Sequence, residues 1–244
     1  MPEPEIVRHA SSQELAEAVA TRLVTRLAEA QAAGREPQVG LTGGTIADAI
    51  HEAAVTASKR VDLDWSRVVF WWGDERYVPG GDDERNARQA RAALLDHVDV
   101  DPAKVHEIPA SDAGYADVEA AADAYAEQLR TSGAGEFDVL MLGVGPDGHV
   151  ASLFPGFPQL DARDRIVVGV TGSPKPPPER VTLTYEALNR SREVWFVVSG
   201  EAKADAVARA LADGTNRHDV PAAGVVGRLG TTWFLDAGSA SRLR

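Results

Sequence analysis

The sequence has no cysteine among its 244 residues, which excludes disulfide bonds, thiol nucleophiles and cysteine-ligated metals. This absence suits a reducing compartment, and we expect a cytoplasmic protein. No apolar run approaches transmembrane length, and Met1–Ala10 lacks the apolar region of a signal peptide, so no membrane partner is expected. Basic residues are also scarce: 25 Lys and Arg stand against 37 Asp and Glu, a formal net charge of −12. Such a chain has no general nucleic-acid footprint, and an anionic metabolite needs a local cluster of cations.

Helical and strand patterns alternate along the chain, which is long enough for a full hydrophobic core. The strand candidates are nearly all apolar, as expected for a sheet covered on both sides. The sequence therefore predicts one α/β domain over residues 1–244, Rossmann-like, with a mostly parallel sheet and helices on both faces. Strands are predicted at 37–41, 68–72, 137–142, 166–170, 194–198 and 232–235, and helices at 86–95, 115–129 and 201–211.

Two further helices are predicted from their starting signals. Ser11 to Glu14 is a capping box followed by apolar residues at helical spacing, and Gly34 ends that helix. Thr45 with Asp48 is the second capping signal. About 35 residues thus precede the first predicted strand, and they form a single helix.

The most informative segment is Gly143–Gly156, which follows the predicted strand 137–142. Ligands bind outside the carboxyl ends of the strands in open α/β sheets, so this segment is expected at a binding site. Asp147 lies two residues before His149, and a carboxylate can hold an imidazole in the tautomer that a general base needs. The alternative is a structural histidine in a loop.

Glycines in this segment also match the spacing G-x-G-x-x-G of dinucleotide-binding folds. That fingerprint requires a long helix after its last glycine, whereas Pro155 and Pro158 interrupt the chain here. We therefore do not expect a dinucleotide cofactor.

An anion site is predicted at Gly43, Gly44 and Thr45, between a strand and a helix start. Backbone N–H groups and the helix dipole favour a negative charge there, and the threonine hydroxyl adds a donor. The loop lacks the Gly-Lys-Ser/Thr of a Walker A motif, which favours a sugar phosphate over a nucleoside triphosphate. The alternative is a tight strand-to-helix turn.

Charged residues in three other places are further candidates. Asp74, Glu75 and Arg76 follow a predicted buried strand, where charges are costly unless exposed or paired. Arg180 begins a short strand-like run, and Lys203 lies in the first turn of a helix, where a bound anion would offset the unfavourable dipole. A solvated ion pair or an ordinary surface lysine is the alternative. The proline-rich stretch 173–178 is a stiff loop, either over one edge of the site or on the surface.

Together these segments resemble the 6-phosphogluconolactonases, which share a superfamily with the glucosamine-6-phosphate deaminases. The matching blocks cover about two-thirds of the chain in the order of the family: 41–45, 73–79 with Asn86, 143–156, 180–184 and 200–203. Two departures are Ile46-Ala47 in place of a Thr-Pro that often ends the glycine loop, and Arg85 where many members have serine. The resemblance implies hydrolysis of 6-phospho-D-glucono-1,5-lactone to 6-phosphogluconate, without a metal or organic cofactor, by a monomer or small homo-oligomer.

The same resemblance implies a role for each candidate. His149 would deprotonate water, Asp147 would orient the imidazole, and Arg76 would stabilise charge on the C1 oxygen. The substrate phosphate would bind the glycine loop, with Arg180 and Lys203 as counter-charges. Asp74 and Glu75 would contact hydroxyls or hold the arginine.

Two other functions stay open at this point. A deaminase typically carries an aromatic residue where this chain has Arg76, and an Ala-Phe-Asn-Glu-Pro type segment where this chain has 151–155 without a glutamate. A sugar-phosphate-sensing module would carry a DNA-binding helix-turn-helix ahead of the sugar domain, and the short helical segment before the first predicted strand argues against one.

Overall fold

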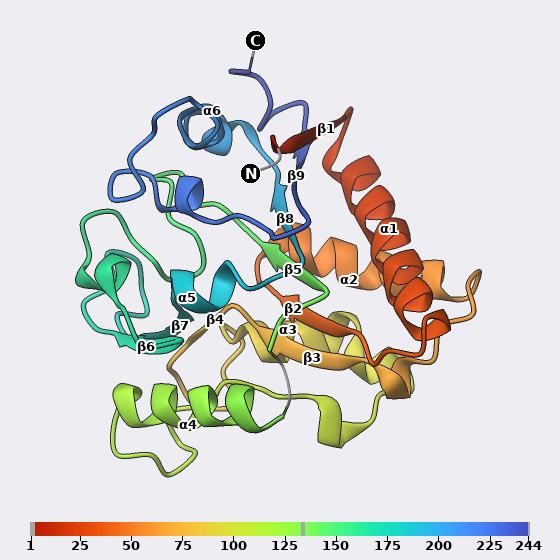
Figure 1. Cartoon of the computed structure of the whole chain (residues 1–244), viewed down its shortest axis with the longest axis horizontal. Coiled ribbons are helices and arrows are strands. Elements are labelled where there is room, and N and C mark those ends of the chain that lie inside the picture. Colours follow the sequence, from red (N-terminus) through yellow and green to blue (C-terminus); the bar gives the residue numbers. More distant parts are fainter. Residues whose placement is uncertain (1–2, 133–134, 244) are drawn as a thin grey trace.

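The computed structural model describes residues 3–132 and 135–243. Within these residues, a six-stranded sheet runs through the centre of the molecule in the order β1-β9-β8-β5-β2-β3, and each neighbouring pair is parallel (Figure 1). Its strands are β1 (Glu5–His9), β2 (Gln38–Leu41), β3 (Val69–Trp72), β5 (Val139–Leu142), β8 (Glu193–Val198) and β9 (Gly230–Asp236). Every residue of β3, β5 and β8 is buried, as the apolar strand patterns predict.

Helices α1 (Ser12–Ala32) and α2 (Thr45–Ser58) pack together on one side of this sheet, at the right of Figure 1. The short helices α5 (Tyr185–Leu188) and α6 (Ala204–Ala210) lie on the other side. Helix α3 (Asn86–Ala93) packs against α2. The predicted α/β fold with a mostly parallel sheet and helices on both faces is confirmed.

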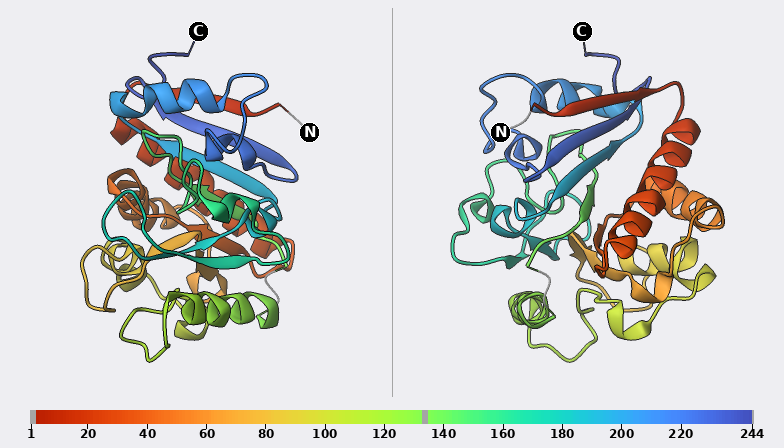
Figure 2. Two further views of the ribbon diagram at one scale, coloured as in Figure 1. Left: turned by 90° about the vertical axis from the view of Figure 1, so that its left-hand side faces the viewer. Right: turned by 45° about the vertical axis from the view of Figure 1, so that its right-hand side comes forward.

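A second, three-stranded antiparallel sheet covers part of the other side, in the order β4-β7-β6. Its strands are β4 (Asp74–Arg76), β7 (Arg180–Leu183) and β6 (Val167–Val170), and helix α4 (Val118–Thr131) packs on β6 and β7. Figure 2 shows this layer beside the twisted main sheet. Because β4 follows β3 after one residue, the charged segment 74–76 passes directly from the main sheet into the second.

The chain reverses its direction of winding between β2 and β5. From β2 it proceeds to β3 at one edge, whereas from β5 it proceeds to β8 and then β9 toward the other edge. A crevice forms at the carboxyl ends of the two strands where such a reversal occurs. The loops after β2 and β5 are the two glycine-rich motifs, so the fold brings them to one place.

Three local expectations need correction. The residues before the first predicted strand, at 37–41, were expected to form one helix and no strand, whereas residues Glu5–His9 form the edge strand β1, paired with β9. Thr45 was expected to cap α2, but the N-cap residue is Gly44, with φ of 98° and no side-chain cap. The helix predicted at 201–211 begins as a 3₁₀ turn, Glu201–Lys203, before α6. The cap on α1 is confirmed, because the Ser11 hydroxyl accepts from the N–H of Glu14.

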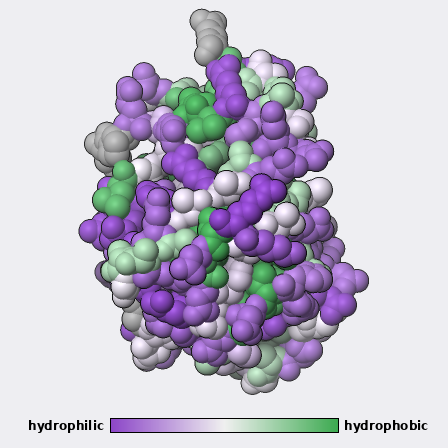
Figure 3. Space-filling model, turned by 90° about the vertical axis from the view of Figure 1, so that its right-hand side faces the viewer, coloured by the Kyte–Doolittle hydropathy of each residue, from purple (hydrophilic) through white to green (hydrophobic). Residues whose placement is uncertain are grey.

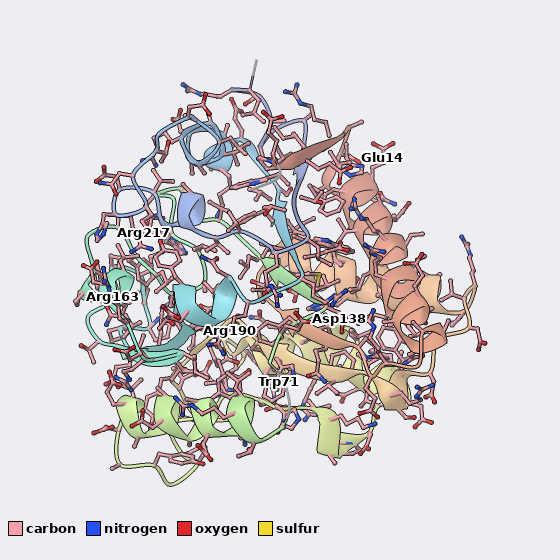
Figure 4. The ribbon with its side chains drawn as sticks, viewed as in Figure 1. Glu14, Trp71, Asp138, Arg163, Arg190 and Arg217 are labelled. Atoms are coloured by element: carbon pink, nitrogen blue, oxygen red, sulfur yellow. The ribbon has the colours of Figure 1, made fainter. Side chains whose placement is uncertain are left out.

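The amino ends of the strands are tied by ion pairs. Asp138, which is labelled in Figure 4, directly precedes β5. Its carboxylate accepts a hydrogen bond from the N–H of Gln38 and forms an ion pair with Arg35. The face that carries α1 is mostly hydrophilic, with small, separate hydrophobic patches (Figure 3). Among the described residues, no helix is both long and apolar enough to cross a membrane.

Candidate active site

The turn after β5 holds His149 and Asp147 in direct contact. Nδ1 of His149 lies 2.6 Å from Oδ1 of Asp147. A carboxylate can only accept, so this contact assigns the ring proton to Nδ1 and leaves Nε2 as the proton acceptor. The imidazole also packs against Phe154, with ring centroids 4.7 Å apart. The pair expected from the sequence is therefore formed, and its histidine is oriented for proton transfer.

Two glycines permit this tight turn. A Cβ on Gly145 would overlap Nδ1 of His149, so only glycine leaves room for the ring. Gly148 has φ of 91°, and a Cβ there would lie 2.7 Å from Val220. The turn is closed by the bond from Gly148 N to Gly145 O and by that from Gly145 N to His149 O, both 2.9 Å. The glycines therefore serve the contact between His149 and Asp147.

The Asp147 carboxyl is kept ionised. Its partial burial raises its pKa, but the hydrogen bond from His149 and the positive charges of His149 and Lys175 outweigh burial and hold the pKa well below its usual range. An ionised Asp147 stabilises the imidazolium that forms when His149 accepts a proton. This is the electrostatic arrangement that a general base requires.

Lys175 also lies at this site, although it was not among the predicted site residues. It lies in the proline-rich loop, and its Nζ is 3.4 Å from Oδ1 of Asp147 and 3.2 Å from Nδ1 of His149. The loop thus lies over the edge of the site, which was one of its two expected positions. The available signal was a single cation inside a stiff stretch of prolines.

The anion site expected in the glycine loop borders a cavity of about 790 Å³. Gly43, Gly44 and Thr45 line it together with Lys203, so these four candidates are brought together. Because no side chain caps α2, its first N–H groups are open to a ligand. Lys203 reaches across to donate to the carbonyl of Val144, 2.7 Å away. Burial and the nearby charge of Lys175 lower its pKa, which a bound anion would reverse.

Asp236, at the end of β9, fixes the loop that presents Lys203. Its carboxylate accepts from the hydroxyl of Ser199 at 2.6 Å and from the N–H of Gly200 at 3.1 Å. Burial raises the pKa of Asp236, but the hydrogen bonds from Ser199, Gly200 and Ser239 lower it by a larger amount. The net pKa is below its ordinary value, so the carboxylate is ionised. This positioning role joins strands β8 and β9, and no local motif signals it.

Arg76 and Arg180 form a second group of cations. They are directly opposite each other on the antiparallel strands β4 and β7. Arg76 donates to the carbonyl of Glu84, and its buried Nε has no partner among the described residues. Like charges in this arrangement repel, which an anionic or polarised ligand oxygen would offset.

Arg180 was expected beside Lys203 at the phosphate, but the structure does not bring the two together. Its buried guanidinium donates to carbonyls of the proline-rich loop, including that of Pro176 at 3.0 Å, and it does not line the cavity with Lys203. The same guanidinium lies 5.8 Å from the centroid of Phe154, which in turn packs on His149. Arg180 thus holds the proline-rich loop by hydrogen bonds and packs on Phe154, the ring that contacts the imidazole of His149.

Asp74 and Glu75 were expected to contact substrate hydroxyls or hold the arginine. The Glu75 side chain is 1% exposed, and its carboxylate accepts from the N–H groups of Arg76, Asn86 and Ala87. Burial raises the pKa of Glu75 to about 7, against the lowering effect of Arg85 and these bonds. Glu75 therefore fastens β4 to the start of α3 and is not open to a ligand.

Asp74 is also mostly buried, and its Oδ2 accepts from the Ser152 hydroxyl at 2.7 Å. The Asn86 amide donates to the backbone carbonyl of Asp74, while its oxygen packs against Gly43. Asp74 and Asn86 thereby link the second sheet to both glycine-rich loops. Asn86 packs against Gly43 and so helps to fix the glycine loop 43–45.

The site contains no obvious metal centre. No group of three or more His, Asp or Glu side chains is arranged to hold a metal ion within residues 3–132 and 135–243. The groups that the site offers are one general base, its carboxylate and several cations. This set suits acid–base chemistry on an anionic substrate.

Similarity to known proteins shows the family to which this chain belongs. The family model for glucosamine-6-phosphate isomerases/6-phosphogluconolactonase matches residues 10–233. The chain belongs to this family. The 6-phosphogluconolactonase of Streptomyces coelicolor is 50% identical over 98% of this chain and 95% of its own length, and the human 6-phosphogluconolactonase is 39% identical over 96% and 91%. The crystal structure of the Thermotoga maritima 6-phosphogluconolactonase has a TM-score of 0.83 at 28% identity, covering 96% of this chain and all of that one.

Membership of this family agrees with the resemblance drawn from the sequence motifs. All five motif blocks from which the resemblance was drawn lie inside the matched range. The similarity also extends beyond those motifs, because the relatives match nearly the whole chain. The family includes both hydrolases and isomerases by its description, so the choice between them depends on the residues of the site.

Proposed function

We propose that the chain hydrolyses 6-phospho-D-glucono-1,5-lactone to 6-phosphogluconate, by activation of water at His149. The names of the curated relatives confirm the lactonase activity expected from the sequence. The single observation that carries the chemistry is the 2.6 Å contact between Nδ1 of His149 and Asp147, which prepares Nε2 to accept a proton. A lactone is an activated ester, so one base and one water are sufficient.

The proposed reaction starts with removal of a proton from water by Nε2 of His149 as the oxygen attacks C1. Asp147 stabilises the resulting imidazolium, and Arg76 stabilises the negative charge that develops on the C1 oxygen. When the ring C1–O bond breaks, the imidazolium returns its proton to the departing oxygen. The product is the open-chain acid, and His149 is again neutral.

The substrate phosphate binds at Gly43, Gly44 and Thr45, with Lys203 as its counter-charge. This assignment is supported by the open start of α2 and by the cavity that these residues share. Binding at the phosphate end supplies the energy that positions the lactone against His149. Asp74, Glu75 and Arg180 act indirectly in this proposal, since each is committed to contacts within the protein.

The deaminase alternative is disfavoured by the residues after the base. Ring opening and isomerisation need a further acid–base group, and the segment Ala151–Pro155 supplies no carboxylate. Ser152 donates to Asp74 and Phe154 packs on the imidazole, so these side chains serve the scaffold.

The test is hydrolysis of the freshly generated lactone at mildly acidic pH, where the spontaneous reaction is slow. The wild-type protein should accelerate it, and His149→Ala should lose about 10²–10⁴ of kcat while remaining folded by circular dichroism. A folded wild-type protein without acceleration would exclude the lactonase. Release of ammonia from glucosamine 6-phosphate would then be assayed.

A further inference from the structure

Lys175 brings an additional charge to the catalytic pair. Because His149 already donates its Nδ1 proton to Asp147, the ammonium beside Nδ1 cannot bond to that nitrogen. It donates to Oδ1 of Asp147 instead, at 3.4 Å. One carboxylate oxygen thus accepts from both groups, and the imidazole lies next to a permanent positive charge.

The backbone of Lys175 is held although its side chain is 40% exposed. Arg180 donates to the carbonyls of Lys175 and Pro176, and the Ser173 hydroxyl donates to the Lys175 carbonyl at 2.9 Å. The N–H of Ser173 bonds to the carbonyl of Pro178, which closes the loop on itself. The loop therefore delivers the ammonium to a defined place.

The charges around the imidazole are mostly positive. The turn itself contributes one carboxylate, and the only aromatic contact of the imidazole among the described residues, Phe154, is uncharged. For a proton added to the free enzyme at His149, the charge of Lys175 therefore opposes the attraction of Asp147. During the reaction, the proton comes with negative charge on the substrate oxygen, so this opposition falls mainly on the free enzyme. The charged groups facing the pair are Asp147, Lys175 of the proline-rich loop, Lys203 after β8, Arg180 behind Phe154, and Arg209 of α6, which donates to the Asp147 carbonyl.

We propose that Lys175 is a positioning residue of the general base. It holds the Asp147 carboxylate against Nδ1, and its charge opposes protonation of His149 in the free enzyme. The inference rests on the proposed role of His149. It assigns a catalytic purpose to the proline-rich loop, whose prolines and whose contacts with Arg180 fix the lysine.

The test compares Lys175→Met, which removes the charge but keeps a long side chain, with Lys175→Arg, which retains it. Lys104→Met is the matched control, because it removes the same charge from a lysine that pairs with Glu36 and, among the described residues, has no contact with the proline-rich loop. The pH dependence of kcat/KM is measured from pH 5 to 7.5 with fresh lactone. In Lys175→Met the acid limb should move upward by about half to one pH unit, so that activity falls up to about tenfold at pH 5.5 but less than about threefold at pH 7.5, with KM little changed. Lys175→Arg and Lys104→Met should keep the wild-type limb.

A second readout does not need activity. Histidine ¹³Cε1 NMR titration, with the His149 signal assigned from a His149→Gln spectrum, should show the same upward shift of its midpoint in Lys175→Met. An unchanged midpoint would overturn the inference while leaving a wild-type lactonase intact. A uniform rise in KM at every pH would also overturn it, because it would make Lys175 a phosphate ligand. Wild-type protein that fails to hydrolyse the lactone would instead remove the proposed function on which the inference rests.

Discussion

The candidate site has two parts, a base end around His149 and an anion end at the start of α2, and they differ in what the protein provides by itself. At one end, His149 and Asp147 are already hydrogen bonded, and Lys175 donates to the same carboxylate. At the other end, the start of α2 has no side-chain cap, and the one bond from Lys203 among the described residues goes to the backbone carbonyl of Val144. The base end pairs its charged groups within the protein and leaves Nε2 of His149 as an acceptor, whereas the anion end leaves donors for a ligand.

This difference follows from what each end must do. A general base works from a fixed geometry before the substrate arrives, so internal hydrogen bonds favour catalysis. A phosphate site must bind an ion reversibly, and donors already paired inside the protein would weaken that binding. We therefore expect changes at the base end to lower kcat and changes at the anion end to raise KM.

After loss of the base itself in His149→Ala, the largest expected effect comes from Gly145→Ala, because the new Cβ would overlap Nδ1 of His149. The ring must move away from Asp147, and we expect kcat to fall about 10- to 10³-fold with KM changed less than about threefold. Steady-state kinetics on the lactone measure both constants.

Gly230→Ala is the matched control, since a Cβ there meets nothing within 4 Å. It should leave both constants unchanged. Retention of wild-type kcat in Gly145→Ala would mean that the contact between His149 and Asp147 is not needed for turnover.

A smaller effect is expected at the anion end from Lys203→Met. Loss of one charge-assisted bond to phosphate, worth about 1.5–3 kcal/mol, should raise KM about 10- to 100-fold and lower kcat less. Lys104→Met provides the comparison, because Lys104 pairs with Glu36 near the amino end of β2. If the two lysine variants had the same KM, the phosphate assignment would be wrong.

The base end was easier to predict from the sequence than the rest of the site. Asp147 and His149 are two residues apart in one turn, so local chain geometry alone brings them together. The approach of Lys203 to the glycine loop needs only the rule that parallel strands end at one edge. The strand β1 was missed because it is short and mostly exposed, and only its pairing with β9 defines it.

Long-range contacts account for the functional details that the sequence did not reveal. Glu75 stabilises the start of a helix eleven residues away, which no local capping pattern encodes. Arg180 was expected at the phosphate as a free cation, but carbonyls of the proline-rich loop accept hydrogen bonds from its Nε and Nη2. Lys175 reaches the base only because of that same loop. A side chain's charge indicates what it could bind, whereas tertiary contacts determine whether it is available.

Two histidines, His149 and His51, differ in the same way: the first has a charged partner and the second has none among the described residues. His51, on α2, is completely buried, and neither of its ring nitrogens has a partner among the described residues. Burial lowers the pKa of His51 to about 4, from an ordinary value near 6.5. Proximity to a carboxylate therefore distinguishes the proposed base, and burial alone gives a histidine that resists protonation.

The smallest effect is expected from His51→Leu, which should leave activity unchanged and alter only the pH dependence of stability. As the pH falls from about 6.5 to 4, the unfolded chain takes up a proton at His51 that the folded protein resists, so the wild type loses stability in that range. Leucine has no such proton to take up and fills a similar apolar space. The free energy of unfolding of the variant minus that of the wild type, from urea titrations, should therefore rise by about 2 kcal/mol between pH 7.5 and pH 5. A difference that does not vary with pH would show that His51 is protonated equally well in the folded and unfolded states, which would contradict its burial without a partner.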